Sequence, residues 1–448
     1  MSPATPRAVA ESAPPAATRT FPRVGVRATR KATFIAFLAW LFAVYDYILF
    51  GTLLPEMSDH FGWSDTRASF ISTLISVGTA VVALGVGPVV DRIGRRRGMI
   101  LTVSGTALAS AATAVTPGAG YLVGVRSLGG LGLSEQAVNA TYLNEIYAVT
   151  EDEKIKKRRG LVYSLVQGGW PLGVLLAAAF VAVFLPLVGW RGCFLIAVFP
   201  ALVIALARRG LKESPQFELE LRLRELRKRG RDAEARELAR SYGVAEEESA
   251  PLAAIFRGPA LRNTLVLGFA WIVNWFGIQV FSVLGTTVLT EGKDVSFTGS
   301  LVMLIVINAV GYLGYVFHGW IGDRFGRRNV VGIGWILSGV FFALTLTVAH
   351  GTFLVVALYS LGMFFLVGPY AALLFYMGEC YDTRCRATGT AFLNALSQPG
   401  AIVAGLIVTA LLAADMSWNG AALLVGAVGT FLSGFVMFAA RPVETLDD

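Results

Sequence analysis

The stretch GPVVDRIGRRR, residues 87 to 97, decides the fold of this chain, because a second copy, GWIGDRFGRR, stands at residues 319 to 328. Both copies read Gly, three residues, Asp-Arg, one residue, Gly-Arg-Arg, and each lies between two long apolar segments. The copies begin at residues 87 and 319, an offset of 232 in a chain of 448 residues. A charged connector that recurs once per half indicates two homologous halves built of membrane helices.

The composition supports a membrane location. Hydrophobic residues make up 55% of the chain, charged residues 15%, and the mean hydropathy is +0.63, which is too apolar for an ordinary soluble protein. The 49 glycines suit close helix packing in a bilayer. The net charge of +8 comes from arginines in short loops between apolar runs. We therefore expect the lipid bilayer as a partner and no nucleic acid.

Cysteine and histidine spacing predicts neither a disulfide framework nor a metal site. The residues concerned are Cys193, Cys380, Cys385, His60, His318 and His350. No nucleotide-binding or catalytic motif occurs either, so we expect no enzyme activity, no metal and no cofactor other than coupling protons. The first 32 residues are rich in Pro, Ala and Arg, and the apolar run after them is too long for a signal peptide.

Twelve segments are long enough to cross a bilayer, which takes about 20 apolar residues. The predicted spans are 33–54, 67–90, 98–117, 120–147, 159–184, 189–208, 262–290, 297–321, 329–349, 352–379, 386–413 and 418–440. The sequence therefore predicts an all-α membrane protein with twelve transmembrane helices in two six-helix bundles. Its predicted parts are a disordered cytoplasmic tail (1–32), a first bundle (33–208), a linker (209–261), a second bundle (262–440) and a cytoplasmic tail (441–448).

The distribution of Lys and Arg predicts the orientation. Of the 38 such residues, all but four fall on the side of the N-terminus; Arg67, Arg191 and Lys293 lie on the other side, and Arg126 lies within the membrane. The positive-inside rule then places both termini in the cytoplasm. In the linker, acidic and basic residues alternate at helical spacing with leucines, which predicts short amphipathic helices on the cytoplasmic face, joined near Gly230.

The connector pattern resembles the signature of the major facilitator superfamily, which lies between helices 2 and 3 and again between helices 8 and 9. The strings LKESPQF (211–217) and RPVETLDD (441–448) are similar to motifs of its sugar porters and aromatic-acid symporters. The resemblance covers almost the whole chain apart from the N-terminal tail. It implies a secondary transporter that works by alternating access. We expect it in the plasma (inner) membrane, as a monomer with a small-molecule substrate.

The connectors are predicted to act as a conformational latch. Gly87 and Gly319 would permit close approach of neighbouring helices, and Gly94 and Gly326 would allow a tight turn. Asp91 and Asp323 are placed to cap helices 3 and 9. The arginines Arg92, Arg95, Arg324 and Arg327 would stay among the lipid headgroups.

Two further strings extend the resemblance to the inner gate. YLNE (142–145) and YMGE (376–379) end helices 4 and 10, and each is followed by arginines. In the superfamily such carboxylates and arginines form salt bridges with the connectors. The resemblance therefore implies that the inner gate is held by Glu145, Arg159, Glu379, Arg386, Arg95 and Arg327.

Two ionisable residues, Asp46 and Arg126, interrupt apolar spans of the first half. Intramembrane charges are costly and are functional candidates by default. At 1.5 Å per residue both lie about 20 Å above the cytoplasmic side. The offset of 232 puts Ile278 and Leu358 at the matching places of the second half, so the pair is no scaffold feature of the repeat. We expect proton coupling or anion binding there, with a structural ion pair as the alternative.

Polar and aromatic residues elsewhere in the spans are candidates for the substrate site. Gln167 resembles a helix-5 glutamine that contacts substrate in sugar porters, although the helix-7 glutamine pair of those proteins is replaced by Val273 and Asn274. The full set of predicted substrate contacts is Tyr45, Arg126, Gln167, Asn274, Gln279, Asn308, Asn394 and Gln398. Glu135 lies about 180° from Arg126 around its helix. A second titrating site and a polar contact with helix 2 or 3 are both open for it.

The sequence thus predicts a proton-coupled symporter of a small organic acid, a carboxylate or an aromatic acid. Helix 1 and the Tyr-x-x-Glu strings resemble those of aromatic-acid and carboxylate symporters, and Arg126 could meet a carboxylate. A sugar or polyol symporter is the alternative, supported by Gln167 and the ESP string. A proton-driven exporter and a membrane sensor without transport activity rank lower.

Overall fold

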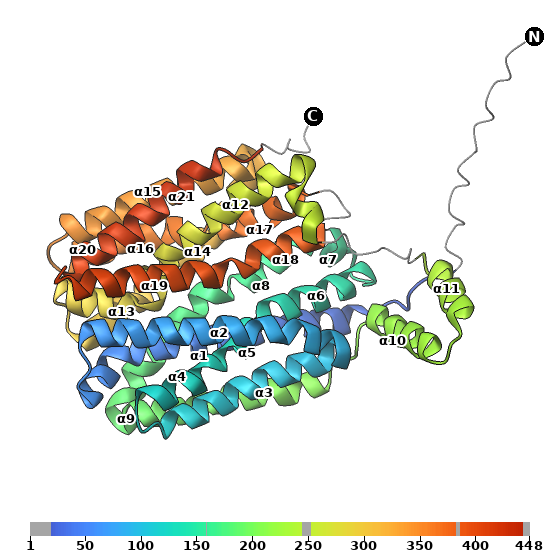
Figure 1. Ribbon diagram of the computed structural model, residues 1–448, viewed down its shortest axis with the longest axis horizontal. Helices are drawn as coiled ribbons and strands as arrows, with labels where there is room; N and C mark the ends of the chain where they lie inside the picture. The colour runs from blue at the N-terminus through green and yellow to red at the C-terminus, as the bar shows by residue number, and fades with distance from the viewer. Residues whose placement is uncertain (1–18, 158, 244–251, 382–385, 442–448) are drawn as a thin grey trace, which may run out of the picture.

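The computed structural model describes residues 19–157, 159–243, 252–381 and 386–441, which are almost entirely helical. Their one β-type pairing is an isolated bridge between Val24 and Thr150. The helices run along one long axis and form two stacked groups, the N-terminal half in blue to green and the C-terminal half in yellow to red (Figure 1). The predicted all-α fold in two bundles is confirmed.

The N-terminal half begins with a long helix and contains a helix 4 that is divided into three. Its elements are α1 Val26–Phe61, α2 Asp65–Ile93, α3 Arg95–Ala114, α4 Ala119–Ser127, α5 Gly129–Leu133, α6 Glu135–Ala148, α7 Glu153–Lys157, α8 Arg159–Gln167 and α9 Gly169–Arg209. Helix α1 begins at Val26, seven residues before the predicted first span, so part of the predicted tail is helical.

The C-terminal half follows a short 3-10 helix and contains three π-helical segments. Its elements are η1 Leu252–Phe256, α12 Gly258–Gly277, η2 Ile278–Val283, α13 Gly285–Thr287, η3 Val288–Gly292, α14 Phe297–Phe325, α15 Arg327–Thr347, α16 Thr352–Val367, α17 Tyr370–Glu379, α18 Arg386–Ala395, α19 Ser397–Ala413, α20 Trp418–Ala422, η4 Leu423–Ala427 and α21 Val428–Met437. The π-helices η2 and η3 divide the predicted seventh span, and such segments often mark functional sites.

Nine helical stretches of the described chain are long and apolar enough to cross a membrane. One of them, Leu165–Arg209, covers most of the two predicted spans 159–184 and 189–208. The chain kinks between these spans, where the backbone of Gly189 leaves helical geometry at φ 66° and ψ 175°. The predicted spans 98–117 and 120–147 coincide with α3 and with α4 to α6 but are not among the nine. The count of twelve crossings stays a prediction.

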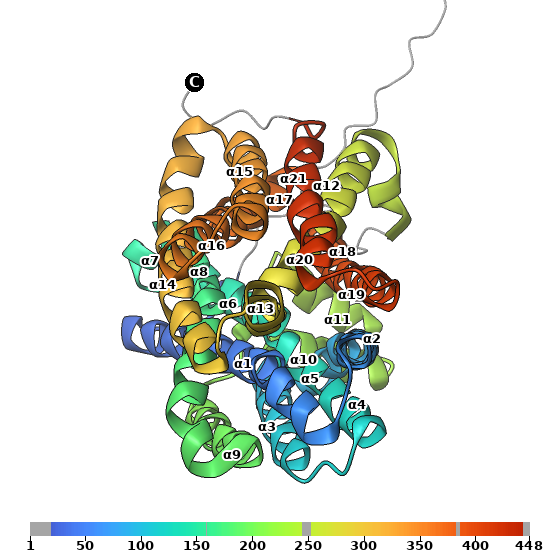
Figure 2. The same ribbon diagram turned by 90° about the vertical axis from the view of Figure 1, so that its left-hand side faces the viewer.

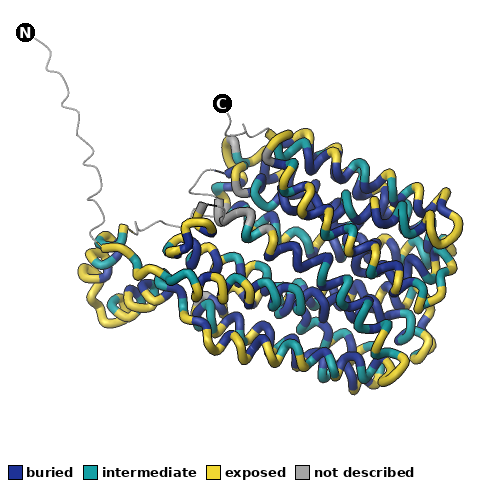
Figure 3. Tube along the Cα trace, turned by 180° about the vertical axis from the view of Figure 1, so that it is seen from behind, coloured by how far each residue is buried: buried dark blue, intermediate teal, exposed yellow. Residues whose placement is uncertain are grey.

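The outward faces of the helices are apolar. Phe199 is 69% exposed, Leu206 60% and Phe353 86%. Figure 3 shows buried residues concentrated between the helices and exposed ones on the outer surface and on the projecting hairpin. Contiguous exposed apolar surface of this kind is disfavoured in water and suits contact with lipid.

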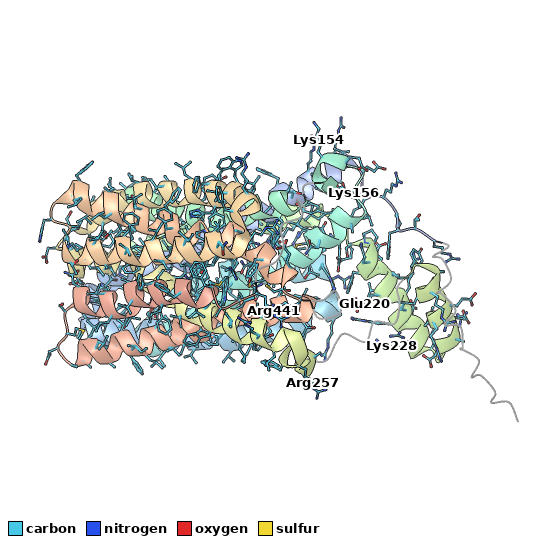
Figure 4. The ribbon with its side chains drawn as sticks, turned by 90° about the horizontal axis from the view of Figure 1, so that it is seen from above. Lys154, Lys156, Glu220, Lys228, Arg257 and Arg441 are labelled. Atoms are coloured by element: carbon cyan, nitrogen blue, oxygen red, sulfur yellow. The ribbon has the colours of Figure 1, made fainter. Side chains whose placement is uncertain are left out.

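The linker forms a helical hairpin, α10 Pro215–Lys228 and α11 Asp232–Ser241, which projects from one end of the bundles (Figure 1). Its turn contains Gly230 at φ 72°, as predicted. The side chain of Ser214 accepts a hydrogen bond from the backbone N–H of Phe217 and so caps α10. Figure 4 places Lys154, Lys156, Lys228, Arg257 and Arg441 at this same end, which we call the linker end.

The two halves meet along a seam that is closed at the end opposite the linker. Helix α2 lies along α19, and α9 lies along α14; Figure 2 shows the first pair side by side. A Cβ at Gly51 would lie 2.1 Å from the carbonyl oxygen of Val283, so α1 and η2 touch through their backbones. At the far end Trp418 Nε1 donates to Asp65 Oδ2 at 2.9 Å.

Candidate functional site

Asp46 of α1 and Arg126 of α4 form an ion pair inside the N-terminal half. Arg126 Nη1 lies 3.3 Å from Asp46 Oδ2, and its Nη2 donates to the backbone carbonyl of Asp46 at 2.8 Å. The hydroxyl of Ser110 on α3 donates to the other carboxylate oxygen. Arg126 and Asp46 are 2% and 5% exposed. The predicted meeting of the two charges is therefore confirmed, and their role stays a prediction.

The glycine-rich string RSLGGLGLS, residues 126–134 of helix 4, explains how Arg126 is positioned. Arg126 lies in the last turn of α4, where a cation suits the helix dipole. A Cβ at Gly130 would lie 2.3 Å from the carbonyl oxygen of Thr79, so only glycine permits this approach of helix 4 to α2. The guanidinium lies over the rings of Phe194 and Phe50, at 5.5 and 5.9 Å from their centroids.

A second buried ion pair, which the sequence did not predict, joins Glu135 of α6 to Arg208 of α9. Nη1 and Nη2 of Arg208 donate to the two carboxylate oxygens of Glu135 at 2.7 and 2.6 Å. Asn139 accepts from the same guanidinium at 3.0 Å, and Thr102 of α3 donates to Glu135. Neither side chain of the pair is exposed. Of the two possibilities left open for Glu135, the structure shows a polar contact with helix 3.

Arg208 was counted among the basic residues on the side of the N-terminus, and the structure buries its side chain. It lies one residue before the end of α9, yet its Nη1 reaches inward and donates to the carbonyl of Met99 at 2.5 Å. Its neighbour Arg209 is exposed. The one sequence feature that pointed to Arg208 is Glu135 itself, because a carboxylate buried in helix 4 requires a cationic partner.

A small cavity lies between the two carboxylates. Its lining includes Asp46, Tyr45 and Glu135, together with Thr106 of α3 and small side chains of α1 and α9. The hydroxyl of Tyr45 is buried and has no hydrogen-bond partner among the described residues. Tyr45 packs edge-on against Phe42 and Phe180, at 6.0 and 5.4 Å between ring centroids. The structure thus places Tyr45 within the N-terminal half, beside Asp46 and away from the predicted substrate contacts at the seam.

Gln167 ends α8 and lies at the seam. Its amide nitrogen donates to Tyr163 at 2.6 Å, and its amide oxygen accepts from Gln136 at 2.9 Å. The indole of Trp40 donates to its backbone carbonyl at 3.3 Å. The contact with the other half is made next to it, where a Cβ at Gly168 would lie 3.0 Å from the ring of Tyr312.

The C-terminal half contributes the other predicted polar residues. Asn274 accepts a hydrogen bond from the hydroxyl of Tyr370 at 2.7 Å. The amide oxygens of the remaining four have no hydrogen-bond partner among the described residues: Gln279, Asn308, Asn394 and Gln398. Three of these side chains are buried, and Asn394 is half-buried. Unsatisfied buried acceptors are what a site for a hydrogen-bonding ligand requires.

Aromatic rings line the seam between these polar groups. Trp170 of α9 meets Trp275 of α12 with ring centroids 5.9 Å apart, and its indole donates to Ser282 of η2 at 3.2 Å. Trp271 lies 5.1 Å from Tyr370. These side chains come from both halves, so their relative positions depend on how the halves are docked. Trp170, Trp271 and Trp275 were not among the predicted contacts.

At the linker end, each half forms its own ion pair between a connector and helix 4 or 10. Arg95 Nε lies 3.3 Å from Glu145 Oε1, and Arg327 pairs with Glu379. These are the pairings that the resemblance implied, and both are formed within a half. Linker residues add to the first pair, because Ser214 donates to Glu145 and both oxygens of Glu213 accept from the N–H of Arg96 at 3.2 Å.

The connector glycines fulfil one prediction and fail another. Gly94 and Gly326 have φ of 105° and 80°, so the tight turns are confirmed. The close approach predicted at Gly87 is wrong for this conformation, since a Cβ there would meet no atom within 4 Å. At Gly319 the nearest atom would be the Cβ of Ala371 at 3.5 Å, an ordinary contact.

Other predicted gating residues are placed only in part. Arg92 is exposed in the last turn of α2, and the guanidinium of Arg324 lies 4.3 Å from the ring centroid of Trp320. The side chains of four further residues are not described: Asp91, Asp323, Arg159 and Arg386. Their predicted capping and pairing stay predictions. In the described chain no three His, Cys, Asp or Glu side chains are grouped as a metal site would need.

Known proteins resemble this chain over most of its length. The family model of the Major Facilitator Superfamily matches residues 35–317 and 309–447. The "Niacin transporter NiaP" of Acinetobacter baylyi is 26% identical over 397 residues, covering 84% of this chain and 86% of that protein. The "4-hydroxybenzoate transporter PcaK" of Pseudomonas aeruginosa is 28% identical over 394 residues, 84% of either chain.

A solved structure supports the fold. The crystal structure of a D-xylose-proton symporter superposes with a TM-score of 0.69 at 18% sequence identity, covering 94% of this chain and 99% of the other. The repeated connectors, the two bundles and the family match agree. This chain therefore belongs to the Major Facilitator Superfamily and is a multi-pass membrane transporter.

Proposed function

We propose that this chain is a proton-coupled symporter of a small aromatic carboxylate, working by alternating access of its two halves. The observation that carries the proposal is the enclosed ion pair of Asp46 and Arg126, which has no counterpart in the second half. A buried charge pair without a scaffold role is costly to keep, and in membrane transporters such groups carry protons or ions.

Asp46 is the proposed proton carrier. Its attachment is asymmetric, with one ion contact of 3.3 Å and one hydroxyl donor, whereas Glu135 is held by two short parallel bonds. Attraction to Arg126 favours the ionised carboxylate, and separation of the two would leave a lone buried charge, which favours proton uptake. A shift of α4 against α1 during the change of access would supply that separation.

Arg126 is a positioning residue for the proton site in this proposal. Its hydrogen bonds and ring contacts are with Asp46, Phe50 and Phe194, all in the N-terminal half. A carboxylate at the seam would not meet its guanidinium in this conformation. We therefore assign the substrate to the seam residues around Gln167, Trp170 and Trp275.

The aromatic seam supports a planar aromatic substrate, since rings prefer edge-on or offset contact with other rings. Relatives named as transporters of niacin, 4-hydroxybenzoate and gallate support the same class. We also propose a monomer in the inner membrane with both termini cytoplasmic, no cofactor besides the proton, and the two bundles at 33–208 and 262–440. The clustering of basic residues at the linker end supports this orientation.

The two ion pairs at the linker end, Arg95 with Glu145 and Arg327 with Glu379, are proposed to keep each half rigid while the seam opens and closes. The bond from Trp418 to Asp65 closes the opposite end in this conformation. Breaking it and closing the linker end would expose the seam to the other side.

Uptake into proteoliposomes tests the proposal. Purified protein would be reconstituted and offered radiolabelled 4-hydroxybenzoate, nicotinate and D-xylose, with and without an imposed inward proton gradient. We expect the proton gradient to drive accumulation of an aromatic acid. A pH-sensitive dye inside the vesicles should report that the interior becomes more acidic. Accumulation of D-xylose and of neither acid would establish a sugar symporter instead. Uptake of the acid at the same rate with and without the gradient would exclude proton symport.

A further inference from the structure

Helix α12 carries a line of polar side chains that have no partner. Trp271 and Trp275 lie one turn apart, and Gln279 follows one turn later, in η2. They are 4%, 7% and 1% exposed. Both indole Nε1 atoms and the Gln279 amide oxygen lack a hydrogen-bond partner among the described residues. A buried polar atom without a hydrogen-bond partner is destabilising, so two donors and one acceptor in a line indicate a missing ligand.

Other buried tryptophans of the chain do not share this property. The indole N–H groups of four of them donate to Gln167, Ser282, Leu366 and Asp65; these are Trp40, Trp170, Trp335 and Trp418. In these four cases the fold satisfies the indole donor. Trp271 and Trp275, whose donors are buried without a partner among the described residues, lie one turn apart on one face of α12.

That face lies at the seam. Trp275 meets Trp170 of the other half at 5.9 Å. Trp271 lies 5.1 Å from Tyr370, whose hydroxyl donates to Asn274 at 2.7 Å. The free donors thus lie beside Trp170 and the predicted substrate contact Asn274.

Buried basic side chains do not compete for a carboxylate here. Among the described residues the buried basic side chains are Arg126, Arg208 and His318. The first two pair with carboxylates of the N-terminal half, and His318 lies against Gly314 and the rings of Phe364 and Phe365 in the other half. An acid bound at the seam would meet neutral donors.

We propose that Trp271 and Trp275 form the carboxylate subsite of the transport site, donating their indole N–H groups to the oxygens of an aromatic acid. Their Cα atoms are about 6 Å apart along the helix, and two indole side chains reach far enough to converge on one carboxylate. Gln279 accepts from a hydroxyl or ring N–H of the substrate. The inference rests on the proposed aromatic-acid transport and adds the residues that recognise the acid group.

Neutral donors suit a transporter that has to release its cargo. An arginine at the site would hold a carboxylate by a strong charge-assisted bidentate pair. A neutral indole N–H also selects an acceptor and orients it, but it attracts a carboxylate less strongly than an arginine does. The charge of the substrate would then be balanced over the cycle by the proton on Asp46, in the other half.

Matched acid and amide ligands test the subsite. Dissociation constants for 4-hydroxybenzoate and 4-hydroxybenzamide, and for nicotinate and nicotinamide, would be measured on detergent-purified parent, Trp271→Phe, Trp275→Phe and the double variant. Phenylalanine keeps a ring and removes the N–H. Because a hydrogen bond to a charged group contributes more than a neutral one, each single change should weaken acid binding about tenfold or more, and amide binding clearly less.

Trp335→Phe is the matched control, since Trp335 is also fully buried but donates to the carbonyl of Leu366 at 3.2 Å. It should leave the acid-to-amide ratio unchanged. Gln279→Glu is a second, independent variant, which should repel the acids and spare the amides even if a tryptophan variant is unstable. Equal weakening of acid and amide, or an unchanged acid affinity in the double variant, would overturn the subsite.

The parent protein separates this inference from the proposed function. If the parent accumulates an aromatic acid but the variants keep its affinity, the subsite alone is wrong. If the parent binds neither acid and accumulates D-xylose, the proposed function is wrong and the subsite with it.

Discussion

Glu135 Oε2 lies 2.6 Å from Arg208 Nη2, in an ion pair that joins α6 to α9 and exposes neither side chain. Asn139 and the carbonyl of Met99 accept further hydrogen bonds from the guanidinium. The pair ties three helices of one half together at a level between Asp46 and the linker end. It contrasts with the looser contact of Asp46 with Arg126, and the contrast leads to different expectations for the two pairs.

Removing one member of the Glu135 pair should destabilise the protein. Breaking a buried ion pair leaves an uncompensated charge and typically costs about 3–5 kcal/mol. Glu135→Ala should therefore lower the thermal unfolding midpoint in detergent strongly, and Glu135→Leu combined with Arg208→Met should recover much of the loss. If Glu135→Gln unfolds like the parent but no longer accumulates substrate against a proton gradient, Glu135 has a role in coupling.

Asp46→Asn should abolish proton-driven accumulation and leave exchange of substrate between equal pools. Asparagine keeps the hydrogen bonds to Ser110 and Arg126 within reach but cannot carry the proton. Because the proton balances the charge of one carboxylate, the cycle moves no net charge, and an imposed gradient of one pH unit, worth about 1.4 kcal/mol, supports roughly tenfold accumulation. The measurement is uptake with and without the gradient. Undiminished accumulation by Asp46→Asn would make the pair a structural one.

Gln167→Ala should raise the apparent KM for substrate by about five- to tenfold, the effect of losing one neutral hydrogen bond. The amide of Gln167 bonds both Tyr163 and Gln136, so its loss also frees those groups. Initial uptake rates over a range of substrate concentrations separate KM from the maximal rate. A parental KM at unchanged expression would exclude Gln167 from the site.

Gly94→Val should impair transport while the protein still inserts. Valine would be forced to a positive φ of 105°, and its Cβ would lie 2.6 Å from the carboxylate of Glu213 and 2.8 Å from the ring of Phe217. The linker would then be pushed off the connector. Gly85→Ala, in the helix α2 that ends just before Gly94, is the control, since a Cβ there meets nothing within 4 Å. Equal transport rates in the two variants would argue against a latch.

The contact of Arg30 with Asp152 should depend on pH. The hydrogen bond from Arg30, at 2.8 Å, and the backbone N–H groups of Lys154 and Ile155 lower the pKa of the Asp152 carboxyl below its usual value. A carboxyl whose pKa is lowered in the folded state stabilises the folded protein at pH values above its pKa in the unfolded state, about 3.9. This stabilisation is lost as the pH falls through the pKa of the folded state. Asp152→Asn should therefore unfold earlier than the parent at neutral pH.

The same two proteins should have similar unfolding midpoints once pH drops well below 4, because the parent carboxyl is then protonated. Thermal unfolding followed by intrinsic fluorescence across this pH range makes the comparison. A difference that stays constant with pH would attribute the effect to packing.

The sequence alone determined the fold and the position of one charged pair. Lipid offers no hydrogen bonds to the backbone, so apolar segments of sufficient length have to be helices, and the repeated connector orders them into halves. Depth along a helix follows from residue count. That is why Asp46 and Arg126 could be predicted at one level and are found 3.3 Å apart.

Only the tertiary structure decided which side chains face each other across helices. Arg208 stands beside the exposed Arg209 at a helix end, and nothing local distinguishes the two; the rotation of α9 against α6 buries one and exposes the other. Likewise Tyr45 turns into its own half, while Trp271 and Trp275 lie at the seam. Contacts between distant segments depend on helix rotation and docking, which a periodic apolar sequence in lipid leaves open.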